Sequence, residues 1–569
     1  MKKDLKLYDV PQINTIQQML IESAEKYSHK IALEDLNPTP IKSVTFVELL
    51  NNVLKFGVAL KNLGLQERAH IAVIGENRVQ WAMSFLTCMC FNYVVVPIDK
   101  NLTTNEIFNI VHESDAEAII FSESYSSTFS GSHASLKKVK HFICMDETKE
   151  DPEFLQMVNL IGKTELPDKK SLPKINPNDL AEIIFTSGSL GRAKGVMLTQ
   201  GNLAANLVDM VSMVIIDEKD RFLSVLPMHH TYECTCGMLC PLYCGASVHY
   251  ARSLKTVVDD IQKVKATILL GVPLLFDKMF KRIMKTISED KVKSKVVPPL
   301  MKITTLLQSA GIKGMKQKIF KELHAKFGGA VRIFIAGGAA PDPLVAKGLR
   351  ELGFTFIQGY GLTETSPILA LNRLDYFKDD AAGVPLPRVE IKINEPDEDG
   401  IGEIWAKGPN IMTGYYKNEK LTDEVFQNGW FKTGDQGYVD EDGFLHIAGR
   451  KKNVIISKSG KNVFPEEIED VLNRSPYILE CMVYGEKDPK QDEIIAVQIV
   501  VDAEAFIEVA EREGIDINDE LINKIIAEEI VKTNKQLASY KQIRKFYIRD
   551  NEFEKTTTQK IKRYLVNKS

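Results

Sequence analysis

Segments with helical periodicity alternate with short apolar runs as far as about Gly400, and this alternation limits the fold more than any other feature. Residues 45–65 are amphipathic and end near a glycine, and residues 69–77, AHIAVIGEN, then have the pattern of a buried strand. The alternation predicts an α/β protein whose parallel or mixed sheets are covered by helices. Loops at the carboxyl ends of such strands are expected to bind ligands. Further strands of this kind are expected at residues 181–185, 221–227, 266–273 and 331–338.

Length and composition narrow the class of protein. At 569 residues the chain is far longer than one ordinary domain, so we expect a large core and a further unit. Its 72 Lys and Arg against 76 Asp and Glu give a formal charge of −4, too balanced to indicate a nucleic-acid binder. The first ten residues lack the apolar stretch of a signal peptide. The uncharged run from Trp81 to Ile98 is interrupted by Asn92 and Pro97, and we interpret it as a buried helix and strand.

Eight cysteines without a secretory signal predict reduced thiols and a cytoplasmic location. Cys234, Cys236, Cys240 and Cys244 crowd together behind His229 and His230, which suggests a metal site. A buried helix is the stronger interpretation. Cysteines spaced by four among Met, Leu and Tyr are typical of small hydrophobic residues on one face of such a helix. Zinc ligands come as spaced pairs, and this stretch has no CxxC pair.

The segment 183–199, IIFTSGSLGRAKGVMLT, has a strand pattern followed by a loop rich in small residues. Backbone N–H groups in such a loop form a concave array that favours phosphate oxygens, and a nearby lysine adds positive charge. A Walker A loop is excluded, since Ala193 precedes Lys194 and Gly195 follows it. A turn without a ligand would explain one or two glycines only. The loop contributes the candidate phosphate-binding residues Thr186, Ser187, Gly188, Ser189, Gly191 and Lys194.

These residues resemble the adenylate-forming superfamily of acyl-CoA synthetases, luciferases and peptide-synthetase adenylation domains, whose loop is close to TSGSTGxPKG. Leu190 and Ala193 depart from that pattern. Later motifs follow in the family's order: GYGLTETSP, FKTGD and GRKKNVI. The resemblance implies that Tyr360 lies near adenine, Thr363 meets phosphate and Glu364 holds Mg²⁺. It also implies nucleotide contacts for Gly338, Ala339, Gly359, Gly361, Asp435 and Arg450, the last two at the ribose.

The same resemblance assigns residues to the acyl pocket, the catalytic lysine, the hinge and the side that meets CoA. LPMHHTYE and FIAGGAAPDP place His230, Tyr232, Gly337 and Gly361 at the acyl pocket. KTTTQKIKRY resembles the family's lysine segment and puts the catalytic lysine at Lys560, with Gln559 and Glu554 departing from the usual glycine and proline. Thr186 and Glu364 are expected to act in catalysis with it. Lys452 corresponds to the hinge, and Gly460 to the side that meets CoA.

The resemblance implies an N-terminal adenylation domain over residues 1–448 with a small β-rich region, a hinge at 449–452, and a small mobile α+β lid over 453–569. It implies that ATP, Mg²⁺ and CoA serve the conversion of a carboxylic acid to an acyl-adenylate and then to acyl-CoA. The helical stretch before residue 331 looks like the insertion in long-chain fatty acyl-CoA ligases, so we expect a medium- to long-chain fatty acid.

Alternatives remain open at this point. The acceptor could be an acyl-carrier protein, the acid could be aromatic, or Leu190, Ala193 and Gln559 could mark a binding protein on an inactive scaffold. We expect no nucleic-acid partner and no transmembrane segment, a monomer or homodimer, and an enzyme compatible with peripheral membrane contact.

Overall fold

The computed structural model describes residues 5–187, 193–309, 315–456, 461–488, 492–556 and 560–566. The chain divides into two compact units. Unit 1 consists of Met1–Ile391, Ala406–Phe431 and Glu441–Leu445, and unit 2 consists of Lys392–Trp405, Lys432–Asp440 and His446–Ser569. Each unit is described by itself, and the boundary expected at residues 448–453 stays a prediction.

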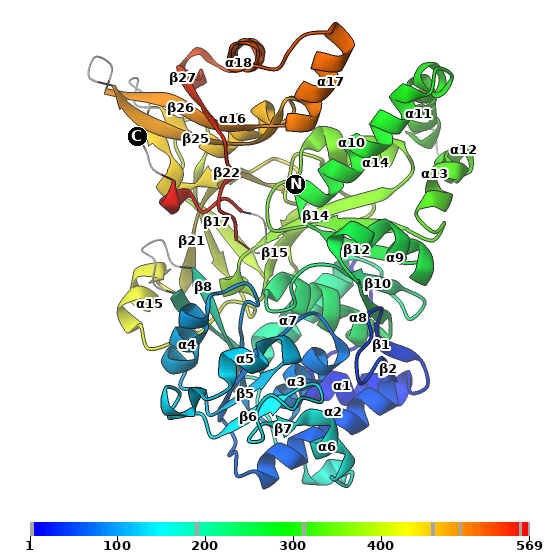
Figure 1. Cartoon of the computed structure of the whole chain (residues 1–569), viewed down its shortest axis with the longest axis vertical. Helices are drawn as coiled ribbons and strands as arrows, with labels where there is room; N and C mark the ends of the chain where they lie inside the picture. The colour runs from blue at the N-terminus through cyan, green and yellow to red at the C-terminus, as the bar shows by residue number, and fades with distance from the viewer. Residues whose placement is uncertain are drawn as a thin grey trace. The chain divides into compact units, whose positions relative to one another are not determined.

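The first sheet of unit 1 has nine strands, and its central strands pair in parallel (Figure 1). Its two ends are antiparallel, because short connections join β1 to β2 and β14 to β15. In sheet order the strands are β16 (Val384–Pro385), β15 (Ile368–Leu371), β14 (Thr355–Gly361), β13 (Ile333–Ala336), β12 (Ile268–Gly271), β10 (Arg221–Ser224), β11 (Ser247–Tyr250), β1 (Ile31–Asp35) and β2 (Ser43–Thr45).

The second sheet of unit 1 has eight strands, and parallel pairs run from β8 through β7. The hairpin of β8 and β9 and the added strand β19 are antiparallel. In sheet order the strands are β19 (Gly414–Tyr415), β9 (Ala193–Thr199), β8 (Leu180–Ser187), β4 (Val94–Pro97), β3 (His70–Ile74), β5 (Ala118–Phe121), β6 (His141–Cys144) and β7 (Leu155–Gln156).

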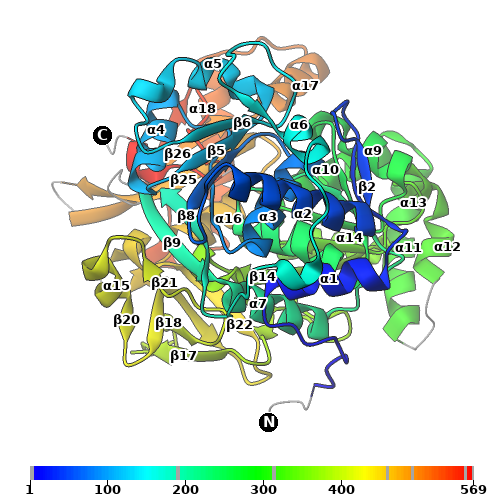
Figure 2. The same cartoon turned by 90° about the horizontal axis from the view of Figure 1, so that it is seen from below.

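Helices cover both faces of the second sheet because its strands are apolar on both sides. Ile71 and Val73 face a cluster with α2 (Phe46–Asn62) and α3 (Val79–Cys90). Their neighbours Ala72 and Ile74 face α4 (Thr104–Glu113) and α5 (Ser126–Phe129) instead. Figure 2 shows α4 and α5 beside β5 and β6, with α2 and α3 across the sheet. The uncharged run from Trp81 is therefore a buried helix and strand, as predicted.

The first sheet shares one of these helical layers. Phe222, Ile268 and Ile357 belong to the same cluster as α1 (Ile16–Lys26), α2, α3, α7 (Gln200–Met213) and α8 (Cys240–Cys244), so these helices pack against both sheets. The opposite face of the first sheet packs on α9 (Val257–Val264), α10 (Pro273–Glu289) and α14 (Pro343–Glu351). The stretch predicted to be helical ahead of β13 contains α10, α11 (Lys293–Ser309), α12 (Met315–Ile319) and α13 (Lys321–Lys326). The strands predicted at 181–185, 221–227, 266–273 and 331–338 are β8, β10, β12 and β13.

Most residues of the small β-rich region fall in unit 2. Its strands are β17 (Glu390–Asn394), β18 (Gly402–Lys407), β21 (Trp430–Val439), β20 (Phe426–Gln427) and β22 (Leu445–Arg450). The rest of unit 2 is α+β, as predicted. It contains β23 (Ile455–Ile456), β24 (Asn462–Val463), β25 (Ile478–Asp488), β26 (Asp492–Val501), β27 (Lys545–Arg549), α16 (Pro465–Leu472), α17 (Ala503–Glu513) and α18 (Asp519–Asn534). The short helices α6 (Met157–Gly162) and α15 (Glu419–Val425) complete unit 1.

Among the described residues, no helix has both the length and the apolar character that a membrane crossing requires.

Candidate functional site

The hairpin of β8 and β9 forms the base of the predicted phosphate loop. In its antiparallel register Thr186 lies opposite Lys194, and Ser187 lies opposite Ala193. The Thr186 hydroxyl donates to the Lys194 carbonyl oxygen at 3.5 Å. The hairpin thus fixes the two ends of the loop beside each other. Gly188, Ser189 and Gly191, which were predicted to bind phosphate, lie outside the described residues.

Lys194 and Glu364 come from distant parts of the chain and form an ion pair. The Lys194 ammonium lies 3.3 Å from Glu364 Oε1, and it also donates to the Tyr415 hydroxyl at 3.0 Å. That hydroxyl donates to Glu364 Oε1 at 2.8 Å, and the Lys194 ammonium lies 4.7 Å from the centre of the Tyr415 ring. The Tyr415 hydroxyl therefore bridges the lysine cation and the glutamate carboxylate at the end of the hairpin.

The turn after β14 positions Glu364. Gly361 is required there, because a Cβ on it would lie 1.7 Å from the Pro367 carbonyl oxygen. Tyr360 precedes Gly361 on the strand, and Thr363 begins the short 3₁₀ helix Thr363–Thr365 that carries Glu364. The Met412 amide donates to the Glu364 carbonyl oxygen at 2.9 Å. Backbone segments approach each other closely in this turn. The turn thereby holds the residues that were predicted to bind the nucleotide and Mg²⁺ next to one another.

Tyr232 and Gly337, both predicted at the acyl pocket, are in contact. A Cβ on Gly337 would lie 2.6 Å from Tyr232 Cζ, so a larger residue would displace the ring. The Tyr232 hydroxyl donates to the Ile335 carbonyl oxygen at 3.1 Å, and burial raises the pKa of this tyrosine well above its ordinary value. Gly338 follows with a φ of +86°, in the region that favours glycine, and Ala339 comes next.

An apolar cavity lies in unit 1 beside these residues. Tyr232 and Gly359, two of the predicted site residues, border it. The remaining lining residues are Met210, Val214, Ile216, Phe222, Cys236, Cys240, Leu270, Ile335, Ala336, Ile357, Ile368 and Leu371.

The cysteines near the cavity lie on a helix that is not a regular α-helix. Residues Tyr232–Leu239 form a π-helix, which continues into α8. Cys236 and Cys240 line the cavity, and burial raises the pKa of the Cys236 thiol well above its usual range. All eight cysteines of the chain are buried as free thiols. The prediction of a buried helix is confirmed, but the wider π turn departs from the regular spacing that was expected.

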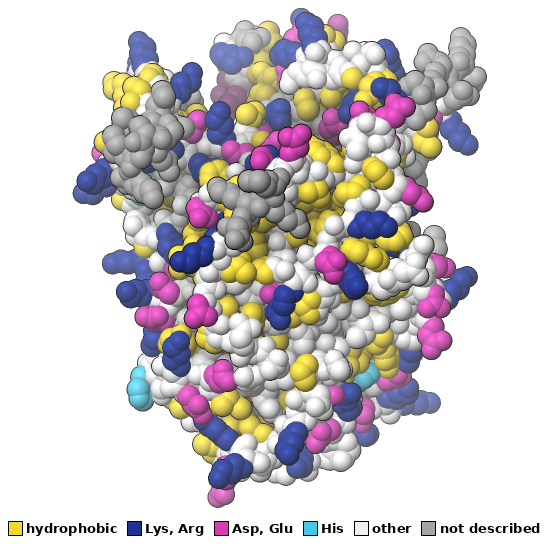
Figure 3. Space-filling view, turned by 180° about the vertical axis from the view of Figure 1, so that it is seen from behind, with side chains coloured by type: hydrophobic (Ala, Val, Ile, Leu, Met, Phe, Trp, Pro, Cys, Tyr) yellow, Lys and Arg dark blue, Asp and Glu magenta, His cyan; other side chains and the backbone are white. Residues whose placement is uncertain are grey.

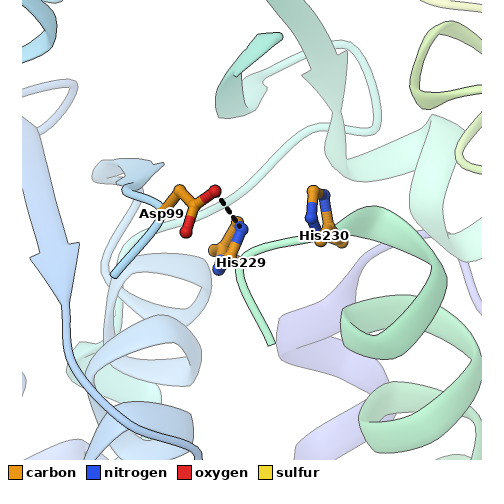
Figure 4. A group of neighbouring side chains, drawn as sticks. All are labelled: Asp99, His229 and His230. Atoms are coloured by element: carbon orange, nitrogen blue, oxygen red, sulfur yellow. Dashed lines mark ion pairs between the residues drawn. The ribbon is translucent and has the colours of Figure 1, made fainter. Parts of the chain in front are cut away.

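His230 belongs to a cluster with His229 and Asp99 (Figure 4). His229 Nε2 lies 3.5 Å from Asp99 Oδ2, and the two imidazole rings have their centres 4.2 Å apart. One potential ligand atom from each side chain lies within 4.8 Å of the other two. Two imidazoles and a carboxylate suit transition metals, whereas Mg²⁺ takes oxygen ligands. The carboxylate of Glu364 therefore fits the predicted Mg²⁺ better than this cluster does.

Unit 2 contains the remaining predicted nucleotide residues, Asp435 on β21 and Arg450 at the end of β22. Arg450 Nε lies 2.7 Å from Asp435 Oδ1, and the carboxylate is almost completely buried. The Asp435 amide donates to the Thr433 hydroxyl at 3.1 Å, and this hydroxyl donates to the Ile404 carbonyl oxygen. Arg450 thus orients one oxygen of a carboxylate that has two acceptors.

Lys560 lies beside Thr556 in the same unit. The Thr556 amide donates to the Lys560 carbonyl oxygen at 2.8 Å, and the Lys560 amide donates to the Thr556 hydroxyl at 3.2 Å. Three residues further on, Arg563 pairs with Glu469. Lys560 itself is exposed. Desolvation lowers the pKa of Lys560, Arg450 lowers the pKa further, and Asp435 opposes the shift.

The predicted hinge residue Lys452 is exposed in the 3₁₀ turn Lys451–Asn453. Gly460, predicted to face CoA, lies outside the described residues. Two contacts were not predicted, those of Tyr415 with Glu364 and of Asp99 with His229. Tyr415 reaches the hairpin because β19 pairs with β9, a pairing between segments more than 200 residues apart that no local pattern indicates.

Comparison with known proteins gives two family matches. The profile described as AMP-binding enzyme matches residues 20–416, and the one described as AMP-binding enzyme C-terminal domain matches residues 467–560. A relative named long-chain-fatty-acid–CoA ligase FadD15, from Mycobacterium tuberculosis, is 28% identical over 92% of this chain and 90% of its own length. The Arabidopsis thaliana protein named long-chain-fatty-acid–[acyl-carrier-protein] ligase AEE15 is 27% identical over 82% of this chain and 74% of its own.

A solved structure with the same fold is the anthranilate CoA ligase AuaEII in complex with anthranoyl-AMP. It has a TM-score of 0.78, 21% identity, and coverage of 99% of this chain and 97% of that one.

Proposed function

Since the chain belongs to the AMP-binding enzyme family, we propose that it is an ATP-dependent acid–CoA ligase. It activates a carboxylic acid to an acyl-adenylate with release of pyrophosphate, and it then transfers the acyl group to the thiol of CoA. One observation carries this proposal: the apolar cavity is lined by Gly359, on the strand that continues through Tyr360 and Gly361 to the turn that bears Glu364. An apolar acid in the cavity would present its carboxylate beside the residues for the nucleotide.

The first step replaces one bond at phosphorus. A carboxylate oxygen attacks the α-phosphorus of ATP, the bond from this phosphorus to the bridging oxygen breaks, and pyrophosphate leaves. Lys194 and the N–H groups of its loop would bind the departing phosphates, because the cation and the hairpin lie together. Glu364 would hold Mg²⁺, which neutralises charge on the phosphate chain when bound. Tyr415 keeps the Glu364 carboxylate oriented before substrates arrive.

Unit 2 would supply the ribose contacts and the catalytic lysine. One Asp435 oxygen accepts from Arg450, and its carboxylate retains acceptor capacity for the ribose hydroxyls. Lys560 would stabilise the negative charge on the transferring group, a contribution that a preorganised cation makes without reorganisation. The second step forms a bond from sulfur to the acyl carbon and breaks the bond from this carbon to the AMP oxygen. Lys452 as hinge and Gly460 on the CoA side are part of the proposal.

The acid is proposed to be a medium- to long-chain fatty acid. Aliphatic and aromatic side chains and two thiols line the cavity, which offers an ionised group no charged partner among the described lining residues. The name of the Mycobacterium tuberculosis relative supports the same class of acid. A second acceptor, the phosphopantetheine of an acyl-carrier protein, is favoured by the name of the Arabidopsis thaliana relative.

One assay tests the activity, the acid and the acceptor together. Pyrophosphate and AMP release would be measured with ATP over a panel of aliphatic and aromatic acids, with CoA, with holo acyl-carrier protein, and with neither. We expect turnover with aliphatic acids and CoA. Turnover with the carrier protein alone would assign the second acceptor, and no pyrophosphate with any acid would indicate an inactive scaffold.

A further inference from the structure

Helix α11 presents two apolar faces, although it lies on the surface of unit 1 beside α10 and α12 (Figure 1). Its inner face carries Val297, Leu300 and Met301, which pack against the cluster that covers the first sheet. These contacts attach α11 to unit 1 through its inner face. The second apolar face is therefore not needed for packing within the described part of the chain.

The outer face carries an apolar stripe. Val292 is 69% exposed, Val296 is 48% exposed and Ile303 is 50% exposed, and Pro299 lies exposed between them. At about 100° per residue these four positions fall within roughly 60° of one another, because their spacing is four, three and four. The helical geometry already begins at Val292, whose carbonyl oxygen accepts from the Val296 amide. We call these four residues the outer stripe.

A row of lysines runs along one side of the outer stripe. Lys291, Lys295 and Lys302 are exposed and fall roughly 70° to 110° from the centre of the stripe at the same helical spacing. None of the three forms an ion pair with another described residue. Residues 278–302 contain eight Lys or Arg and two acids, Glu289 and Asp290. Figure 3 shows hydrophobic and basic side chains next to one another at its upper left.

We propose that the outer stripe and its lysine row dock on the surface of an anionic lipid bilayer. A helix with an apolar face beside a lysine-rich polar face lies in the plane of the membrane interface, with its apolar side chains at the acyl boundary. Lysines can extend their ammonium groups toward lipid phosphates while their alkyl stems remain at the boundary. A protein partner is less suitable, because protein interfaces are depleted in lysine.

The docking would also give the enzyme access to its acid. Long-chain fatty acids partition into bilayers, so a bound enzyme meets a higher local concentration of substrate than an enzyme in the aqueous phase. This consequence rests on the proposed function, whereas membrane binding rests on the surface of α11 alone.

Sedimentation with vesicles tests the docking on the full chain. Partition coefficients would be measured with vesicles of phosphatidylcholine alone and with vesicles containing one third phosphatidylglycerol, at low and high salt. The triple variant V292S, V296S and I303S removes the outer stripe, and the triple variant K291S, K295S and K302S removes the lysine row. The matched controls are L166S with I215S, which changes exposed apolar residues elsewhere, and K163S with K170S and K174S.

The docking predicts binding to the anionic vesicles that weakens with salt. Each lysine near an anionic surface contributes about fivefold, so loss of the row should weaken partition by on the order of a hundredfold. Loss of the outer stripe should weaken it at least tenfold, and the control variants should bind as the parent does. Circular dichroism and turnover of octanoic acid without vesicles would show that each variant is folded, and absence of turnover in the parent would count against the proposed function only.

Equal binding of the parent, the variants and the controls would overturn the docking. So would vesicle binding by none of them, or a change in oligomeric state of the α11 variants without vesicles, which would indicate a protein partner.

Discussion

The Lys194 ammonium lies 3.3 Å from Glu364 Oε1, although 170 positions separate the two residues in the chain. The pair is partly buried, with the lysine side chain 30% and the glutamate side chain 12% exposed. The cation that we propose for phosphate and the carboxylate that we propose for Mg²⁺ are thus held next to each other without a ligand. Pre-organisation of this kind removes the need to rearrange charges during the reaction.

Replacement of Lys194 by alanine should depress acyl-adenylate formation on the order of a hundredfold, since one preorganised charge contact is lost. Tyr415→Phe keeps the ring below Lys194 but removes the hydroxyl that donates to Glu364, so we expect about a tenfold loss. Acid-dependent ATP–pyrophosphate exchange measures both. Near-parental exchange by the alanine variant would remove Lys194 from the phosphate site.

Replacement of Lys560 by alanine should slow adenylation by on the order of a hundredfold or more. Lys562→Ala is the matched control, because Lys562 is two residues further on and has no assigned role. The lowered pKa of Lys560 also predicts that adenylation declines at an alkaline pH below the ordinary pKa of lysine, since the ammonium form is required. Single-turnover rates across the pH range measure both effects, and a parental rate in the alanine variant would contradict the assignment.

Val214→Phe should shift the chain-length preference toward shorter acids, because Val214 lines the cavity and a larger side chain occupies space for the acyl chain. Each methylene contact that is lost raises the free energy of the transition state by about 1–3 kcal/mol, and kcat/KM falls accordingly. The neighbouring residue Ile215 is exposed and is not a lining residue, so Ile215→Phe is the control. Measurement of kcat/KM over a series of saturated acids compares the two. An unchanged profile in Val214→Phe would place the acid elsewhere.

The buried carboxyl group of Glu182 should make the protein less stable as the pH rises. Burial raises the pKa of Glu182 from 4.5 to about 8, and neither carboxyl oxygen has a hydrogen-bond partner among the described residues. Between these pH values the folded chain keeps a proton that the unfolded chain has released. The free energy of unfolding therefore falls by up to about 1.4 kcal/mol per pH unit in this window.

Glu182→Gln should make this pH dependence shallower, because glutamine does not titrate. Denaturant unfolding at pH 5 and pH 8 measures the difference, and the exposed Glu113→Gln is the control. The same slope in all three proteins would show that Glu182 keeps its ordinary pKa.

The strands could be predicted because apolar periodicity is local. The runs at 181–185 and 331–338 are β8 and β13. Tyr232 and Gly337, both predicted at the acyl pocket, lie in contact, while the pocket assignment itself stays a prediction. The contacts of Tyr415 and Asp99 could not be predicted, since each depends on pairing between segments far apart in the chain. The outer stripe was also missed, because an exposed apolar face and a core-facing one have the same sequence pattern.

Oxygen-18 in the carboxylate of a fatty acid tests the central claim most directly. If the carboxylate attacks the α-phosphorus of ATP and CoA then displaces AMP, the AMP formed in the complete reaction carries one labelled oxygen, which mass spectrometry detects. Unlabelled AMP, or ADP with label in inorganic phosphate, would contradict the acyl-adenylate route.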